Sequence, residues 1–378
     1  MKPTYSPAPD VGAKPDAATF AMLQLSLAEG LGPKFVEQLL QQFGSAECIV
    51  EASDATLSRV PGMGSTRIQK IRGAEHFATA EWQACHRREV DILARNHIGY
   101  PQSLLEICDP PTVLYVRGKL STTDRRAIAI VGTRRPSNYG VQQARRLATM
   151  LSQCGFTVIS GLARGIDAVA HRATMATGGR TLAVMAGGLG DIYPPEHRDL
   201  ASQISEYGAV LSELALHRKP RRGAFPRRNR LIAGLSIGVI VVEARRRSGA
   251  LITAGHALDQ GREVFAVPGR VDSGASHGCH QLLREGARLV ESVDDVLEEL
   301  TGSPWLLSSV GSPAPDTSHL NERESAVFGA IQADATRIEE VAKETQLPIH
   351  QVLATISVLE MRRLIERPTG DTVLRRVP

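Results

Sequence analysis

The central part of this 378-residue chain alternates short apolar strands with helical segments, and no other feature restricts its fold as much. The strand candidates are Val113–Val116, Ala127–Val131, Thr157–Ser160, Thr181–Met185, Val210–Ser212, Ile237–Val242 and Glu263–Val267. Helical patterns separate most of them, over Gly140–Cys154, Ile166–Ala176, Pro195–Tyr207, Arg228–Gly234, Ala250–Gln260 and Cys279–Glu285. This alternation predicts an α/β domain with a doubly wound parallel sheet. Ligands of such sheets bind outside the carboxyl ends of the strands.

The first strand-end loop, in the stretch AIAIVGTRRPSNYG, is basic. The strand ends at Gly132, and the turn that follows contains Thr133, Arg134, Arg135 and Ser137. Backbone amides at the start of the next helix would point at a ligand phosphate. A dinucleotide site would have a second glycine in place of Arg134, and an acid at the end of the next strand, where this chain has Ser160 and Gly161. We therefore expect a polyanion at this turn, and no nicotinamide, flavin or other cofactor.

Two further loops place glycines at strand ends. The turn SGLARGID contains Gly161, Arg164 and Gly165, with Asp167 as a candidate helix cap. Its alternative interpretation is a tight turn with a salt-bridged arginine. The turn AGGLG contains Gly188, and its glycines would let backbone approach a phosphate closely. Tyr193, just beyond, either stacks on a base or packs under its loop.

The most basic part of the chain lies between His217 and Arg230, where seven Lys or Arg residues occur without an acid. It includes Arg221 and Arg222 and the run Arg228, Asn229 and Arg230 at a predicted helix start. Arginines at the positive end of a helix are unfavourable, so they indicate an external anion. A second basic triplet, Arg245–Arg247, precedes the small, polar helix start 248–255. For both clusters the alternative is a solvated surface.

Several classes of function are disfavoured by what the chain lacks. Its five cysteines are scattered without a C-x-x-C pair, and its histidines have no metal-like spacing. A Walker lysine loop does not occur, and neither G-x-S-x-G stretch, 234–238 or 274–278, directly follows a predicted strand as a nucleophile elbow does. No apolar stretch is long enough for a membrane span, and residues 1–18 lack the apolar segment of a signal peptide. We expect a cytoplasmic protein with no membrane contact, no metal site and no catalytic residues.

Composition divides the chain into five parts. We predict a disordered tail over 1–18, a helical module over 19–99, the α/β core over 100–301, a Ser/Pro/Gly-rich linker over 302–318 and a winged helix over 319–378. The helical module has two glycine turns, at 30–33 and 61–64, typical of helix-hairpin-helix or sterile-alpha-motif-like folds. These turns either bind DNA phosphates or connect packed helices. The winged helix either contacts duplex DNA or binds a protein.

Six motifs together resemble the DprA/Smf family of bacterial DNA-processing proteins. They are IVGTRRPSNYG, SGLARGIDAVAH, AGGLGDIYPPEHRDL, FPRRNRLIAGLS, VVEARRRSGALITA and FAVPG, in family order. The resemblance implies an extended Rossmann-like core between the helical module and the winged helix. It also implies a non-catalytic protein that binds single-stranded DNA, dimerises through the core, protects incoming DNA and loads RecA during natural transformation.

The resemblance also assigns roles to residues. Arg134 matches the family's principal DNA-binding arginine, and Gly132, Gly161, Arg164, Gly165 and the 228–230 run match positions that line the same basic pocket. Many relatives carry a basic residue directly after Tyr-Pro, where this chain has Pro195. Arg198 or the pair Arg221/Arg222 would have to compensate. The dimer surface is expected in the late core, over Val264–Leu300.

A nucleotide N-glycosidase of the lysine-decarboxylase-like group is the competing enzyme hypothesis, because its sheet is similar. That group carries a P-G-G-x-G-T-x-x-E stretch whose glutamate works on the sugar. At the corresponding helix start this chain has SGALITA, with no glutamate at the required spacing after the threonine. The sequence therefore favours the binding protein.

Overall fold

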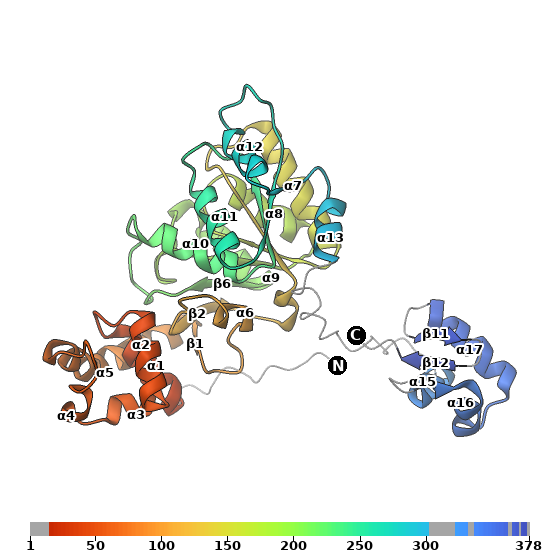
Figure 1. The fold of residues 1–378 in the computed structure, drawn as a ribbon, viewed down its shortest axis with the longest axis horizontal. Coiled ribbons are helices and arrows are strands. Elements are labelled where there is room, and N and C mark those ends of the chain that lie inside the picture. The colour runs from red at the N-terminus through yellow and green to blue at the C-terminus, as the bar shows by residue number, and fades with distance from the viewer. Residues whose placement is uncertain (1–14, 302–321, 332–335, 362–364, 370–371, 376–378) are drawn as a thin grey trace. The chain divides into compact units, whose positions relative to one another are not determined.

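The computed structural model describes residues 15–301, 322–331, 336–361, 365–369 and 372–375, which fall into two units divided between residues 302 and 303 (Figure 1). In the first unit the described strands form a nine-stranded sheet in the order β1-β2-β6-β5-β4-β3-β7-β8-β9. The strands are β1 (Asp91–Ala94), β2 (Val113–Gly118), β3 (Ala127–Gly132), β4 (Thr157–Ser160), β5 (Thr181–Val184), β6 (Ala209–Ser212), β7 (Gly238–Val242), β8 (Glu263–Ala266) and β9 (Arg288–Leu289). In the sheet order, all neighbouring strands from β6 through β5, β4, β3, β7 and β8 to β9 are parallel. Strand β2 is antiparallel to both of its neighbours, β1 and β6. The predicted doubly wound sheet is thereby confirmed.

Helices cover both faces of the sheet, which is why its central strands are apolar throughout rather than alternating. The helices of this unit after β1 are α6 (Gln102–Leu105), α7 (Asn138–Gln153), α8 (Ile166–Ala176), α9 (Arg198–Tyr207), α10 (Ala224–Gly234), α11 (Gly249–Asp259), α12 (His277–Arg284) and α13 (Val293–Thr301), with 3-10 turns η1 (Thr122–Arg125) and η2 (Pro195–His197). Figure 1 shows α10 and α11 on one side of the sheet and α7 and α8 on the other. Apolar side chains fill both faces.

Two strands were missed by the sequence pattern, and both lie at the sheet's edges. β1 has only four residues, none of them aromatic and only one β-branched, and β9 has two. Because β1 pairs with β2, the sheet begins before the predicted boundary between residues 99 and 100. The helix predicted at Arg228 begins four residues earlier, at Ala224.

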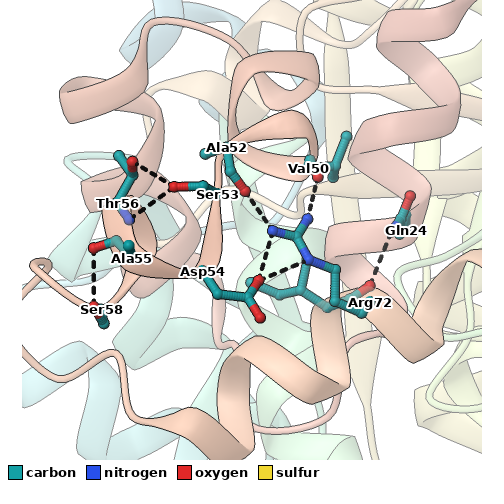
Figure 2. Close-up of polar contacts among 10 residues, drawn as sticks. Gln24, Val50, Ala52, Ser53, Asp54, Ala55, Thr56, Ser58 and Arg72 are labelled. Atoms are coloured by element: carbon teal, nitrogen blue, oxygen red, sulfur yellow. Dashed lines mark hydrogen bonds and ion pairs between the residues drawn. The ribbon is translucent and has the colours of Figure 1, made fainter.

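The N-terminal module consists of α1 (Ala17–Leu27), α2 (Pro33–Phe43), α3 (Ala46–Glu51), α4 (Asp54–Leu57) and α5 (Ser65–His86). Asp16 caps α1, so the helix starts two residues inside the predicted tail, of which residues 1–14 lie outside the described part. The two glycine turns precede α2 and α5, and Gly32 and Gly64 occupy the N-cap positions. Arg72 of α5 joins the module together, since its guanidinium donates to the carbonyls of Val50 and Ala52 and to the Asp54 carboxylate (Figure 2).

The module packs directly on the sheet. Its buried side chains belong to the same apolar cluster as Tyr115 of β2 and Met185 after β5. Glu81 of α5 accepts a hydrogen bond from the Leu216 amide at 2.5 Å, and Arg88 donates to the Gly190 carbonyl at 3.3 Å. The helical module and the core therefore share one hydrophobic interior.

The second unit has the arrangement of a small winged helix. Its described helices are α15 (Glu322–Ala330), α16 (Ile338–Thr345) and α17 (Ile349–Met361), and a three-stranded antiparallel sheet joins β10 (Thr336–Arg337), β12 (Thr372–Arg375) and β11 (Ile365–Thr369). Apolar residues of all three helices and of the hairpin form its core. The predicted linker over 302–318 lies outside the described residues.

Candidate nucleic-acid interface

A cavity of about 320 Å³ opens at the carboxyl ends of the parallel strands. It lies where the strand order reverses, because β4 follows β3 on one side while β7 lies on the other. Its walls come from the end of β3, the loop between β7 and α11, and the start of α10. A reversal of strand order leaves a crevice at which ligands bind in open α/β sheets. We call this space the strand-end cavity.

Arg134 projects into the strand-end cavity with its charge available. Its guanidinium lies 5.3 Å from the centre of the Phe225 ring, a cation–π contact. No carboxylate of the described residues pairs with it, and the side chain is exposed. The Phe225 ring meets Tyr193 edge to face at 6.0 Å. Arg134, Phe225 and Tyr193 thus form one continuous surface, the aromatic–arginine platform, which also borders a smaller second pocket beside Arg164.

The start of α7, where a phosphate was predicted, is already filled by the protein. Glu243 follows β7, and its carboxylate accepts hydrogen bonds from the Ser137 amide at 2.9 Å and from the Ser137 hydroxyl. A carboxylate satisfies the open amides and the dipole of a helix N-terminus as a phosphate would. Ser137 is therefore an N-cap tied to Glu243, and its contact with DNA stays a prediction.

The loop between β4 and α8 is filled in the same way. The Asp167 carboxylate accepts hydrogen bonds from the amides of Gly161 and Ala163, at 3.0 and 3.3 Å. Burial raises the pKa of Asp167, while the nearby Arg228 cation and these amides favour its charged form. Asp167 does not cap the following helix as predicted, and the Gly161 amide is not available to a ligand phosphate.

Arg228 and Asn229 line the strand-end cavity, but they are mostly committed to internal contacts. Arg228 is only 5% exposed, and its Nη1 donates to the carbonyls of Gly161 and Val184. Burial lowers the pKa of Arg228 to about 10, so the guanidinium is still charged at neutral pH. Asn229 accepts from Arg228 Nε at 3.2 Å and donates to the Gly249 carbonyl at 3.1 Å. Its side-chain amide therefore links α10 to α11.

Arg230 lies outside the strand-end cavity, which corrects its predicted role. Its guanidinium forms ion pairs with the buried Glu213 carboxylate and, at 3.1 Å, with Asp109. Burial raises the pKa of Glu213, and the charges of Arg230 and Arg227 oppose that shift. Arg230 thus neutralises a buried acid and contributes no free charge to a ligand.

The other predicted residues divide into packing glycines and free surface charges. A Cβ at Gly165 would lie 2.3 Å from the Thr133 carbonyl oxygen, and one at Gly188 would lie 2.0 Å from that of Ala215, so both glycines serve close backbone packing. Gly132 and Thr133 line the strand-end cavity. Arg164 lines the second pocket and forms an ion pair with Glu196, as its alternative interpretation had it. The remaining predicted arginines are exposed and lie outside both pockets, so their contact with DNA stays a prediction: Arg135, Arg198, Arg221 and Arg222.

Four residues of the site were missing from the predicted set. Phe225 forms the centre of the platform, while Arg245, Arg247 and Ser248 line the strand-end cavity opposite β3. The basic triplet after β7 was itself a visible signal, because it follows a strand that pairs with β3. Phe225 had no comparable signal, since a lone aromatic residue in a basic run predicts nothing specific.

His171 of α8 is buried, and its pKa in the folded protein is far below that of a free histidine. Its Nδ1 lies 2.7 Å from the Thr181 hydroxyl, which itself donates to the Val158 carbonyl. The proton of the neutral ring is therefore on Nδ1, and Nε2 has no hydrogen-bond partner among the described residues. Burial lowers the pKa of His171 to about 3, with a further contribution from nearby His197 and arginines.

Stability should fall on acidification because of His171. The unfolded chain takes up this proton near pH 6.5, while the folded chain resists it down to about 3. The free energy of unfolding is therefore expected to decrease by about 1.4 kcal/mol per pH unit below pH 6.5 from this group alone. Urea unfolding of His171→Gln should show lower stability at pH 8 and a shallower decrease between pH 6.5 and 5. Equal slopes for the two proteins would contradict the buried neutral ring.

Two further observations concern metal ions and membranes. In the described part of the chain, no group of three His, Cys, Asp or Glu side chains is placed to bind a metal ion. None of the described helices combines the length and apolar character that a bilayer crossing needs.

Three family models match the chain in the order of its parts. The model described as "DNA recombination-mediator protein A" matches residues 91–301, the winged helix domain of DprA matches 311–371, and a SAM-like helix-hairpin-helix tandem matches 22–73. The first match includes β1, in agreement with the sheet.

Curated relatives and solved structures agree with these matches. Protein Smf of Synechocystis is 34% identical over 94% of this chain and 98% of its own length, and protein Smf of Escherichia coli is 40% identical over 73% and 75%. The structure of DNA processing protein A from Streptococcus pneumoniae has a TM-score of 0.66 at 34% identity, over 74% of this chain and 97% of that one. The Helicobacter pylori protein, whose structure is described as showing its single-stranded DNA binding mode, has a TM-score of 0.51 at 30% identity, over 56% and 96%.

Proposed function

The chain belongs to the DprA/Smf family of DNA-processing proteins, and we propose from that membership that it binds single-stranded DNA across the aromatic–arginine platform and the strand-end cavity. The observation that carries this proposal is the unpaired Arg134 guanidinium stacked on Phe225 at 5.3 Å. A cation beside aromatic rings suits a single strand, because phosphates need charge and unpaired bases need a flat apolar partner. Every base has such a face, so the binding should tolerate any sequence.

Fluorescence anisotropy of a labelled oligonucleotide and of its duplex, at two salt concentrations, tests the proposal. The single strand should bind more tightly than the duplex, because only unpaired bases can stack on Phe225 and Tyr193. The logarithm of the affinity should fall linearly with that of salt, by about 0.7 for each phosphate neutralised. Equal affinity for both forms, or affinity that salt does not change, would contradict the proposed site.

Replacing Phe225 by alanine should separate stacking from charge. Loss of one base–aromatic stack is expected to weaken single-strand binding by about 1–3 kcal/mol, while the dependence on salt stays the same. Phe77→Ala is the matched control, because that ring is exposed on α5 and lies outside both pockets. Anisotropy titrations at several salt concentrations measure both quantities, and a changed salt slope in Phe225→Ala would argue against pure stacking.

The wider role follows from the family. We propose that this protein acts in the cytoplasm, where it protects incoming single strands and delivers them to RecA in transformation. The family description as a recombination mediator supports a role in recombination. We further propose a homodimer through the core, over Val264–Leu300, because the two-residue strand β9 ends the sheet there and Leu289 is exposed. The winged helix would contact either duplex DNA or a protein. The site is assigned a binding role and no reaction.

A further inference from the structure

The start of α11 forms one wall of the strand-end cavity and is open to a ligand. Ser248 is the N-cap, and its hydroxyl accepts from the Ala250 amide at 3.3 Å. Within the described residues the Gly249 amide has no acceptor. This differs from the start of α7 and from the β4–α8 loop, where Glu243 and Asp167 occupy the amides. The positive end of α11 therefore faces the cavity without an internal anion.

Three arginines line the strand-end cavity together with this helix start. Arg245 and Arg247 are exposed, line the strand-end cavity and form no ion pair with any described carboxylate. Arg228 is 95% buried in the wall, and although its Nε and Nη1 have acceptors, its Nη2 has none among the described residues. Because Nη2 is not among the buried unpartnered atoms, it is accessible from the strand-end cavity and can donate a charge-assisted hydrogen bond to an anion there. Asp167, the acid of this wall, is already held by two amides.

Part of the lining of the strand-end cavity is apolar. Phe225 and Ile232 of α10 and Ile252 of α11 contribute to it, and Ile252 is 42% exposed. A volume of about 320 Å³ is at the small end of ligand sites, which span roughly 300–1,000 Å³. The space therefore suits a single nucleotide, with a charged end at α11 and a flat apolar end at Phe225.

We propose that the strand-end cavity holds one nucleotide that carries a terminal phosphate, with this phosphate at the start of α11 between Arg245, Arg247 and Arg228. A phosphomonoester has a charge of about −1.5 to −2 at pH 7, more than one phosphodiester of a continuous strand, and so matches this cluster better. The nucleotide is either the 5′-phosphorylated end of a DNA strand or a free nucleoside monophosphate. For a strand end as the source, the inference rests on the proposed function. For a free nucleoside monophosphate it does not.

Paired oligonucleotides with a 5′-phosphate or a 5′-hydroxyl test the first source. The full-length protein should bind the phosphorylated strand about tenfold more tightly, the size expected when an added charge meets a helix N-terminus and arginines. The measured quantity is the ratio of the two affinities. A general loss of positive charge weakens both affinities alike and leaves their ratio unchanged. In the double variant Arg245→Ala/Arg247→Ala the ratio should approach one. Arg246→Ala removes one positive charge outside the cavity and should keep the ratio.

Calorimetry with dTMP and with thymidine tests the second source. Binding of dTMP but not thymidine, lost in the double variant and kept in Arg246→Ala, assigns the site to free nucleotides as well. A 5′-phosphate preference without dTMP binding assigns it to strand ends. If single strands bind but both end types bind equally and dTMP does not bind, this inference is overturned while the proposed function stands. If single strands do not bind at all, the proposed function fails, and the dTMP result alone decides the inference.

Discussion

Replacing Arg134 by alanine should weaken single-stranded DNA binding by about 2 kcal/mol, or roughly 30-fold, for every sequence alike. Arg134 is the cation of the aromatic–arginine platform, and no described carboxylate competes for it. Its removal takes away a charge-assisted hydrogen bond to phosphate and also the cation that covers Phe225. The salt slope should decrease by about 0.7, the value for one phosphate contact on a single strand. Anisotropy with oligonucleotides of different base composition measures all three effects.

Two variants make this result specific. Arg145→Ala on α7 removes the same charge from an exposed side chain outside both pockets, and it should change the affinity less than twofold. Arg134→Lys keeps the charge but loses the planar group that stacks on Phe225, so it should recover only part of the affinity. If Arg145→Ala weakened binding as much as Arg134→Ala, net charge rather than this site would determine affinity.

The largest effect on stability is expected from breaking the Arg230–Glu213 pair. Both side chains are about 5% exposed, so removal of either leaves a buried charge with only its more exposed second partner, Asp109 for Arg230 or Arg227 for Glu213. Arg230→Ala and Glu213→Ala should each lower the free energy of unfolding by about 3–5 kcal/mol. Against a total stability of about 5–15 kcal/mol, this is a large fraction. Urea unfolding followed by circular dichroism measures it.

The same helix supplies the control for this pair. Arg227 also pairs with Glu213, at 3.2 Å, but its side chain is 48% exposed, so Arg227→Ala should cost less than about 1 kcal/mol. The double variant Arg230→Met/Glu213→Leu should be far more stable than either single variant, since no buried charge remains. A loss of DNA affinity in Arg230→Ala under conditions where it is fully folded would restore the predicted binding role of Arg230.

Much of the fold could be read from the chain because its signals are local. Seven strands and the helices between them were predicted, since buried strands such as β7 are continuous runs of apolar, largely β-branched residues. β1 and β9 escaped because two to four residues carry no periodicity, and only pairing with a neighbour makes them strands. The winged helix was visible from its helical spacing and its strand near Val373.

The sequence by itself determined the fold class, the family motifs and the gathering of basic loops at the strand ends. Only the tertiary structure decided which of these charges and amides remain available. Glu243 occupies the helix start that was predicted for phosphate, although it lies 106 residues from Ser137. Glu213 likewise neutralises Arg230, whereas Arg134, Arg245 and Arg247 have no such partner among the described residues. The physical reason is that a charge is neutralised by whatever lies within a few ångströms, and folding brings those partners from distant parts of the chain.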